Sequence, residues 1–187
     1  MKNAERFFVV TGGPGSGKTT LIEALEAAGF ARTVEAGRAV IQEQLASRGD
    51  ALPWKDRSAF AEAMLTRDIR SYEEAREQAG PVIFDRGIPD VIGYLRLCGL
   101  AVPAQMTKAA ADFRYHRRVF IAPPWREIYA QDAERKQDFD EAQRTYDAMV
   151  EVYTGLGYEL VELPRVSVAE RVRFVVELPL TGRHGRA

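Results

Sequence analysis

The stretch "TGGPGSGKTT", Thr11 to Thr20, directly follows the apolar run "RFFVV" at Arg6 to Val10. It fits the pattern G-x-x-x-x-G-K-[ST], whose four fixed positions are occupied by Gly12, Gly17, Lys18 and Thr19. The pattern is informative when a strand precedes it and a helix follows it. Both conditions hold here, because an amphipathic stretch with Leu21, Ile22, Leu25 and Ala28 on one face comes next. The stretch therefore predicts a phosphate-binding P-loop.

Each residue type in this loop has a physical reason. Glycines allow the backbone to turn with its N–H groups facing inward, which makes a nest for anions at a helix N-terminus. We expect Lys18 to reach the β- and γ-phosphates of a nucleotide and the Thr19 hydroxyl to ligate Mg²⁺. The expected nucleotide-binding residues are Gly12, Gly13, Pro14, Gly15, Ser16, Gly17, Lys18, Thr19 and Thr20.

The identity of the base is partly constrained by what the chain lacks. Guanine-specific P-loop GTPases read their base with an Asn-Lys-x-Asp motif, and the only asparagine of this chain is Asn3. A guanine-reading motif of this kind is therefore absent. The expected cofactors are ATP and Mg²⁺.

The composition is that of one ordinary globular domain. The chain has 187 residues, with 26 Lys and Arg against 27 Asp and Glu, so no global positive charge attracts nucleic acid or an anionic membrane. A single cysteine fits a reducing compartment, and no apolar run approaches the length of a membrane span. We expect a cytoplasmic protein without nucleic-acid or membrane partners. Residues 1–180 are expected to form a single domain, followed by a disordered tail at 181–187.

The pattern along the chain predicts an α/β fold. Helical patterns, among them residues 56–79 and 138–156, separate short apolar runs with strand character, which is typical of a parallel sheet with helices on both faces. The expected strands are Arg6–Thr11, Arg32–Glu35, Val82–Asp85, Arg118–Ala122 and Glu159–Leu163.

The third expected strand ends in an acid, in "PVIFDRG" at Pro81 to Gly87. Asp85 would lie beside the P-loop at the carboxyl edge of the sheet, where it can hold Mg²⁺ or assist the attacking group. Capping of the next turn is the alternative role for this acid. Hydrolytic ATPases usually place a glutamate after the acid, whereas this chain has Arg86, a cation suited to phosphate oxygens. This substitution disfavours hydrolysis and favours transfer to a bound acceptor.

Four blocks of sequence together resemble a known family: "GGPGSGKTT", "EAGR" at Glu35–Arg38, "DRGIPD" at Asp85–Asp90 and "PPWREIYAQDAERKQDFDEAQRTY" at Pro123–Tyr146. They are similar to the predicted AAA-type ATPases related to the kinase domain of nicotinamide riboside kinase proteins, within the nucleoside- and nucleotide-kinase-like P-loop group. The resemblance runs from Phe7 to about Arg173. It implies a three-layer P-loop NTPase fold with sheet order 2-3-1-4-5 and a helical lid. The chain departs from AAA+ machines because it lacks their Walker B glutamate and C-terminal helical domain.

The resemblance also implies roles for residues away from the P-loop. The charged segment after the fourth strand resembles a lid that closes over the phosphates, with Arg126, Arg135 and Lys136 as its cations. A solvated helix face is the alternative. In related nucleoside kinases an acid at the end of the second strand accepts the proton of the attacking hydroxyl, which makes Glu35 a candidate general base. Glu35 can instead be a helix-terminal acid paired with Arg38.

The resemblance further places adenine near the backbone of Arg165 to Ser167. Trp54 and Trp125 each follow a proline. Lining of a ligand pocket is one interpretation of either, and partly exposed packing is the simpler one. The acceptor pocket is expected within residues 36–60 and 88–115.

Two functions remain open at this level. The first is an ATP-dependent phosphotransferase that moves the γ-phosphate to a small metabolite. The second is a nucleotide-dependent binding or regulatory ATPase with slow hydrolysis. The candidate catalytic residues are Lys18, Glu35, Asp85, Arg86, Arg126 and Arg135, with Thr19 and Asp85 as candidate metal ligands, and the general base is Glu35 or Asp85.

Overall fold

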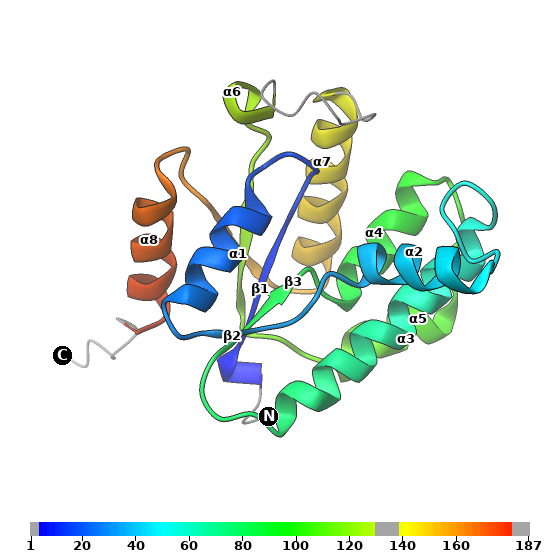
Figure 1. Cartoon of the computed structure of the whole chain (residues 1–187), viewed down its shortest axis with the longest axis horizontal. Helices are drawn as coiled ribbons and strands as arrows, with labels where there is room; N and C mark the ends of the chain where they lie inside the picture. The colour runs from blue at the N-terminus through cyan, green and yellow to red at the C-terminus, as the bar shows by residue number, and fades with distance from the viewer. Residues whose placement is uncertain (1–3, 130–138, 181–187) are drawn as a thin grey trace.

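A five-stranded parallel sheet forms the centre of the computed structural model, which describes residues 4–129 and 139–180 (Figure 1). Its order is β2-β3-β1-β4-β5, the order that the resemblance implied. In register, Val10 of β1 lies opposite Asp85 of β3 on one side and Phe120 of β4 on the other. The strands are β1 (Phe7–Gly12), β2 (Ala31–Arg32), β3 (Val82–Asp85), β4 (Arg118–Ala122) and β5 (Glu159–Glu162).

Helices cover both faces of the sheet, which gives the three-layer P-loop fold (Figure 1). One face carries α1 (Lys18–Ala27) and α8 (Val168–Leu180). The other carries α2 (Ala36–Ser47), α3 (Arg57–Arg76), α4 (Ile88–Leu97), α5 (Ala104–Asp112) and α7 (Phe139–Gly155). The short helix α6 (Arg126–Tyr129) follows β4, and a 3₁₀ turn (Ala4–Arg6) precedes β1.

Two apolar clusters, one on each face, hold these layers together. β1 and β3 are buried at every position because helices pack on both of their faces. Phe7 and Val9 point into the cluster under α3 and α4, whereas Phe8 and Val10 point into the cluster under α1 and α8. This alternation fixes the register of β1, because a slip by one residue would exchange the two faces.

The second strand is shorter than expected. It ends at Arg32, and Glu35 is the N-cap residue of α2 and not the last residue of the strand. The strand lies at the edge of the sheet, and Val34 is 56% exposed, so no buried side chain extends the pairing. Glu35 nevertheless lies near the carboxyl edge of the sheet, beside Arg86.

The helix expected at residues 56–79 ends at Arg76, three residues early. The 3₁₀ turn before β1 holds this end of the helix, because the Arg6 guanidinium donates hydrogen bonds to four carbonyls in and just after the last turn. These belong to Ala75, Arg76, Gln78 and Gly80, at 2.7–3.1 Å. Gly80 then adopts φ 79° ahead of Pro81.

The other element boundaries agree with the expectation to within one residue. In the described part of the chain, no helix has the length and apolar character needed to cross a bilayer. The expected tail at 181–187 lies outside the described residues.

Candidate active site

The P-loop connects β1 to α1 with its glycines in left-handed conformations, φ 71° at Gly15 and φ 75° at Gly17. These angles are favourable only without a side chain. Gly12 and Gly13 are required for space as well. A Cβ at Gly12 would collide with the carbonyl oxygen of Ala122, and one at Gly13 with the carbonyl oxygen of Ala142 in α7. The backbone of the P-loop therefore packs directly against the backbones of β4 and α7.

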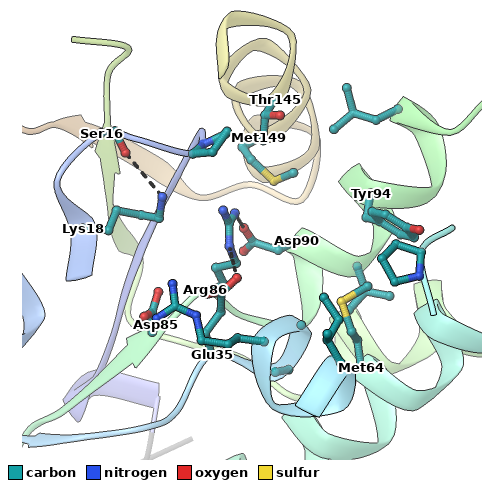
Figure 2. Close-up of a pocket in the computed structure, with 18 of the residues that line it drawn as sticks. Ser16, Lys18, Glu35, Met64, Asp85, Arg86, Asp90, Tyr94, Thr145 and Met149 are labelled. Carbon is teal, nitrogen blue, oxygen red and sulfur yellow. Dashed lines mark hydrogen bonds and ion pairs between the residues drawn. The ribbon is translucent and has the colours of Figure 1, made fainter. Parts of the chain in front are cut away.

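Lys18 begins α1 with its ammonium group folded back over the loop. Its Nζ donates to the carbonyl of Gly13 at 2.6 Å and to Oγ of Ser16 at 3.3 Å (Figure 2). Burial and the charge of Arg86 lower the pKa of Lys18 to about 7, although Asp85, Glu35 and Asp90 act in the opposite direction. The lysine thus sits where phosphate charge would stabilise its protonated form.

Arg86 follows β3 and links two acids. Its Nε donates to Oε1 of Glu35 at 3.2 Å and its Nη1 to Oδ1 of Asp90 at 3.0 Å (Figure 2). Burial would lower the pKa of Arg86, but Glu35, Asp90 and Asp85 raise it beyond its ordinary value. Its backbone is left-handed, with φ 68°, which is uncommon for a residue other than glycine. Such strain is concentrated at functional sites.

Asp90 is the hub of a buried hydrogen-bond network. Its Oδ1 accepts from Thr11 Oγ1 at 2.5 Å in addition to Arg86, and its Oδ2 accepts from the backbone N–H of Gly87 at 3.0 Å and from Tyr153 at 2.6 Å. The Gly87 bond caps α4. The other bonds tie β1, β3 and α7 together and fix the Arg86 guanidinium.

The two remaining carboxylates experience opposite environments. Burial raises the pKa of Asp85, and the nearby charge of Glu35 adds to this effect. Burial would also raise the pKa of Glu35, but Arg86, Lys18 and Arg38 outweigh it, so that this pKa lies below its ordinary value. Two neighbouring acids with separated pKa values are the pattern of a site in which each has its own role.

A cavity of about 980 Å³ joins the P-loop to these charged residues and continues between α2, α3, α4 and α7. Its inner wall is mostly apolar and includes Phe60, Met64, Val91, Tyr94 and Met149. Figure 2 shows Met64 and Tyr94 across the cavity from Lys18 and Ser16, with Arg86 and Asp90 between the two sides and Met149 above them in the view. A volume of this size accommodates a small molecule beside the phosphates.

The family model described as AAA domain matches residues 7–171. The chain belongs to the AAA domain family. No curated protein sequence matches it.

Solved structures with the same fold include NadR protein and two kinases. NadR protein in complex with NR superposes with a TM-score of 0.69 and 18% identity, covering 97% of this chain and 51% of that one. This AAA domain thus spans about half the length of the NadR chain. Deoxyadenosine kinase from M. mycoides with bound dATP superposes with a TM-score of 0.57 and 14% identity, covering 94% of this chain and 100% of that one. Thymidylate kinase from Ehrlichia chaffeensis superposes with a TM-score of 0.58 and 15% identity, covering 95% of this chain and 100% of that one. At these identities the likeness shows the P-loop kinase fold.

The cavity of this AAA domain brings together most of the residues singled out from the sequence. Lys18, Glu35, Asp85, Arg86 and the loop from Pro14 to Thr20 all line it. Arg126 does not; it is exposed and its guanidinium lies 4.1 Å from the ring centre of Phe139. Arg135 and Lys136 lie outside the described residues.

Pairing of Glu35 with Arg38 was the alternative to its role as a base, and the structure pairs Glu35 with Arg86 instead. Arg38 lines the cavity, but no ion pair among the described residues joins it to Glu35. Arg86 forms this ion pair because its side chain and that of Glu35 are both partly buried at the sheet edge, whereas Arg38 is exposed to solvent.

Sequence reasoning missed two parts of the cavity wall. One is α7, which contributes Glu141, Arg144, Thr145 and Met149 although it lies far along the chain. The other is Asp68, a buried acid on the apolar face of α3. Burial raises the pKa of Asp68 well above its usual range, and the charges of Asp90 and Glu35 raise it further. The sequence did contain a signal for Asp68, because this acid shares one face of the helix with the apolar residues Phe60, Met64 and Tyr72.

Magnesium is compatible with the residues present. Among the described residues, no cluster of three or more His, Cys, Asp or Glu side chains forms a dedicated metal cage. Mg²⁺ usually needs only one or two protein ligands, with substrate phosphates and water completing its shell. Asp85 and the exposed Thr19 line the same cavity and offer one carboxylate and one hydroxyl.

Proposed function

We propose that this chain is an ATP-dependent phosphotransferase that moves the γ-phosphoryl group to a hydroxyl or phosphate of a small metabolite. The observation that carries the proposal is the continuous cavity, which places the P-loop and an apolar compartment on either side of the Glu35–Arg86–Asp90 network. A pure nucleotide switch has no use for a second compartment of this kind. Residues 1–180 act as one unit in this proposal.

The proposed reaction uses the chain's groups as follows. The P-loop N–H groups and Lys18 hold the triphosphate, and an acceptor oxygen attacks the γ-phosphorus. The bond from that phosphorus to the β–γ bridging oxygen breaks, and ADP leaves. Glu35 takes the acceptor proton, because its lowered pKa keeps it ionised. Proton removal needs little driving force in a loose transition state, so a weak base is sufficient.

Arg86 and Asp85 have separate roles in the proposal. Arg86 neutralises charge on the transferring group and is oriented for this by its bonds to Glu35 and Asp90. Asp85 and Thr19 would hold Mg²⁺, which would supply positive charge against the phosphates. Arg126 and Arg135 belong to the segment after β4. They would add positive charge around the transferring phosphoryl group when that segment closes over the phosphates.

The fold neighbours support the proposal by analogy. NadR has been solved with NR and with NAD and AMP-PNP, and deoxyadenosine kinase with dATP and with the products dCMP and dCDP. Two of these structures hold two such molecules at once, NAD with AMP-PNP and dCMP with dCDP. We propose the same general arrangement here, with ATP as donor in the cytoplasm, with no nucleic-acid or membrane partner.

The test is acceptor-dependent release of ADP. ATP and Mg²⁺ are incubated with the protein alone and with a panel of nucleosides, nucleoside monophosphates and other small alcohols. We expect one class of acceptor to increase ADP release at least tenfold, with a phosphorylated acceptor detected by mass spectrometry. Slow ADP release that no acceptor accelerates would support the regulatory ATPase instead.

The first prediction concerns Lys18. Lys18→Ala removes the cation beside the β/γ-phosphates, and we expect it to weaken ATP binding or abolish turnover while the circular dichroism spectrum is retained. Lys55→Ala is the control, because Lys55 is an exposed lysine paired only with Asp50. Equal ATP affinity and turnover in the wild type and in Lys18→Ala would contradict the proposed function.

A further inference from the structure

A buried acid in the apolar part of the cavity has no partner. Asp68 lies on α3 and lines the cavity, and only 8% of its surface is exposed. Within residues 4–129 and 139–180, its carboxyl group forms no hydrogen bond and no ion pair. Buried acids are normally hydrogen-bonded or paired, because an isolated buried charge is costly. The position of Asp68 therefore needs a reason outside the packing of the fold.

The charges around Asp68 are mostly negative. Burial raises its pKa and the charges of Asp90 and Glu35 raise it further, whereas Arg86 acts in the opposite direction. Arg86 is already paired with both Glu35 and Asp90. Its charge is therefore compensated twice over, and little of it is left to neutralise Asp68.

A bound nucleotide would not supply the missing positive charge. In the proposed function Lys18 faces the triphosphate and Asp85 faces Mg²⁺. The other cations that line the cavity are exposed to solvent, where water screens their charge. They are Arg38, Arg57 and Arg144. With nucleotide bound, Asp68 remains the buried acid of the wall that nothing neutralises.

The walls beside Asp68 suit an organic cation. Phe60 and Met64 share one face of α3 with Asp68 at intervals of four residues, and both line the cavity. The ring of Tyr94 in α4 lies 5.4 Å from that of Phe60, with the two planes at 73°. Aromatic faces attract ammonium groups, whereas metal ions need several oxygen ligands. No group of three such ligands occurs in the described part of the chain.

We propose that Asp68 binds a positively charged nitrogen of the acceptor, so that the metabolite phosphorylated here is an organic cation with a hydroxyl group. This inference rests on the proposed phosphotransfer and names the class of its acceptor. The hydroxyl oxygen is the one that attacks the γ-phosphorus, with its proton passing to Glu35. The cationic end lies in the apolar part of the cavity, where it provides the charge that Asp68 lacks.

A matched pair of probes tests the charge directly. Choline and 3,3-dimethyl-1-butanol have the same shape and the same hydroxyl group, and differ in a charged nitrogen in place of a carbon. Their affinities are measured by calorimetry with Mg²⁺ and a non-hydrolysable ATP analogue. We expect the wild type to bind choline about tenfold more tightly than the neutral alcohol, or better.

Variants of α3 assign the preference to Asp68. Asp68→Asn keeps the shape and removes the charge, so we expect choline affinity to fall about tenfold and affinity for the neutral alcohol to change less than about twofold. Glu62→Gln is the matched control, because Glu62 is an exposed acid on the same helix. It should bind both probes as the wild type does.

The stability of the ligand-free protein provides a second readout. The pKa of Asp68 is higher in the folded protein than its ordinary value of 3.8, so this acid makes the fold less stable as pH rises above that value. At pH 7 we therefore expect Asp68→Asn to melt at a higher temperature than the wild type. A lower melting temperature would make Asp68 a structural acid and overturn the proposal.

The remaining outcomes separate the cation site from the proposed function. Equal affinities of the wild type for the two probes, or equal choline affinities of the wild type and Asp68→Asn, would overturn the cation site. A neutral acceptor that both proteins phosphorylate at the same rate would overturn the cation site and leave the phosphotransferase standing. ADP release that no acceptor accelerates, choline included, would overturn the proposed function and the acceptor class with it.

Discussion

Glu35 and Asp85 are carboxylates at the same edge of the sheet with pKa values moved in opposite directions. Arg86 causes much of the difference, because it donates directly to Glu35. A residue that stays ionised near an attacking hydroxyl suits proton acceptance. Asp85 is the last residue of β3, the strand-end position from which P-loop NTPases hold their metal. We therefore expect Asp85, and not Glu35, to be the acid on the metal side.

The second prediction distinguishes these two acids. Glu35→Gln keeps the shape and removes the charge, so we expect acceptor-dependent kcat to fall by about 10²-fold or more with ATP affinity nearly retained. Asp85→Asn should instead raise the Mg²⁺ concentration needed for half-maximal activity. Steady-state kinetics over a magnesium series measures both effects. Wild-type turnover in Glu35→Gln, with the true acceptor, would remove Glu35 from the role of base.

The third prediction concerns the pH dependence of stability through Lys18. Its pKa is about 7 in the folded protein and 10.5 in its unperturbed state. Between these values the unfolded chain holds a proton that the folded chain does not, so stability rises with pH in this window. The contribution is complete above pH 10.5 and is lost as pH falls through 7. The slope reaches up to about 1.4 kcal/mol per pH unit.

Urea unfolding at pH 7, 8 and 9 measures this effect against Lys18→Met, which cannot titrate. We expect the free energy of unfolding of the wild type to rise relative to Lys18→Met across the series. Parallel curves for the two proteins would show that Lys18 keeps an ordinary pKa.

At the scale of the elements, α7 is as important to the site as the P-loop. It packs on α4 and β1, supplies Tyr153 to the Asp90 network and places Thr145 and Met149 in the cavity wall. Gly13 is the point where the P-loop meets the α7 backbone. The spacing between loop and helix therefore depends on the absence of a side chain at that position.

The fourth prediction tests this contact. In Gly13→Ala the new methyl group collides with the Ala142 carbonyl, which belongs to the backbone and cannot rotate away. We expect the free energy of unfolding to fall by about 1–3 kcal/mol and ATP binding to weaken, because loop and helix must separate. Gly155→Ala, at the end of the same helix, meets no atom within 4 Å. It should be neutral or stabilising by up to about 1 kcal/mol. Equal stability of the two variants in urea titrations would exclude this backbone packing.

At the scale of the whole molecule, the cavity is built by segments from both halves of the chain. The P-loop, α2, α3, α4 and α7 all contribute, and the sheet order brings them to one edge. A ligand that fills the cavity bridges these elements, and it binds the folded state alone. Binding should therefore stabilise the whole domain.

The fifth prediction follows from this linkage. ATP and Mg²⁺ at about 100 times the dissociation constant should add about 2.7 kcal/mol of stability. For a chain of this length that corresponds to a rise of about 5–10 °C in melting temperature. Differential scanning calorimetry measures the rise, and the Lys18→Ala variant under the same conditions is the control. No shift at saturating ATP would argue against nucleotide binding by this domain.

The sequence by itself determined the P-loop, the order and type of the main elements and the presence of Asp85 and Arg86 behind the third strand. These features depend on local spacing and on the period of apolar residues, which are visible along the chain. Glu35 could be placed at the sheet edge for the same reason, because parallel strands present their carboxyl ends together.

Only the tertiary structure decided which charges meet. The sequence offered Arg38 as the partner of Glu35, yet Arg86 takes that place, and Asp90 gathers donors from β1, α4 and α7. Asp68 and Arg171 are single polar residues on largely apolar helix faces, and their environment is set by neighbours 17 to 155 positions away. Ion pairing and burial depend on distances in space and on the exclusion of water, and neither quantity is encoded by local pattern.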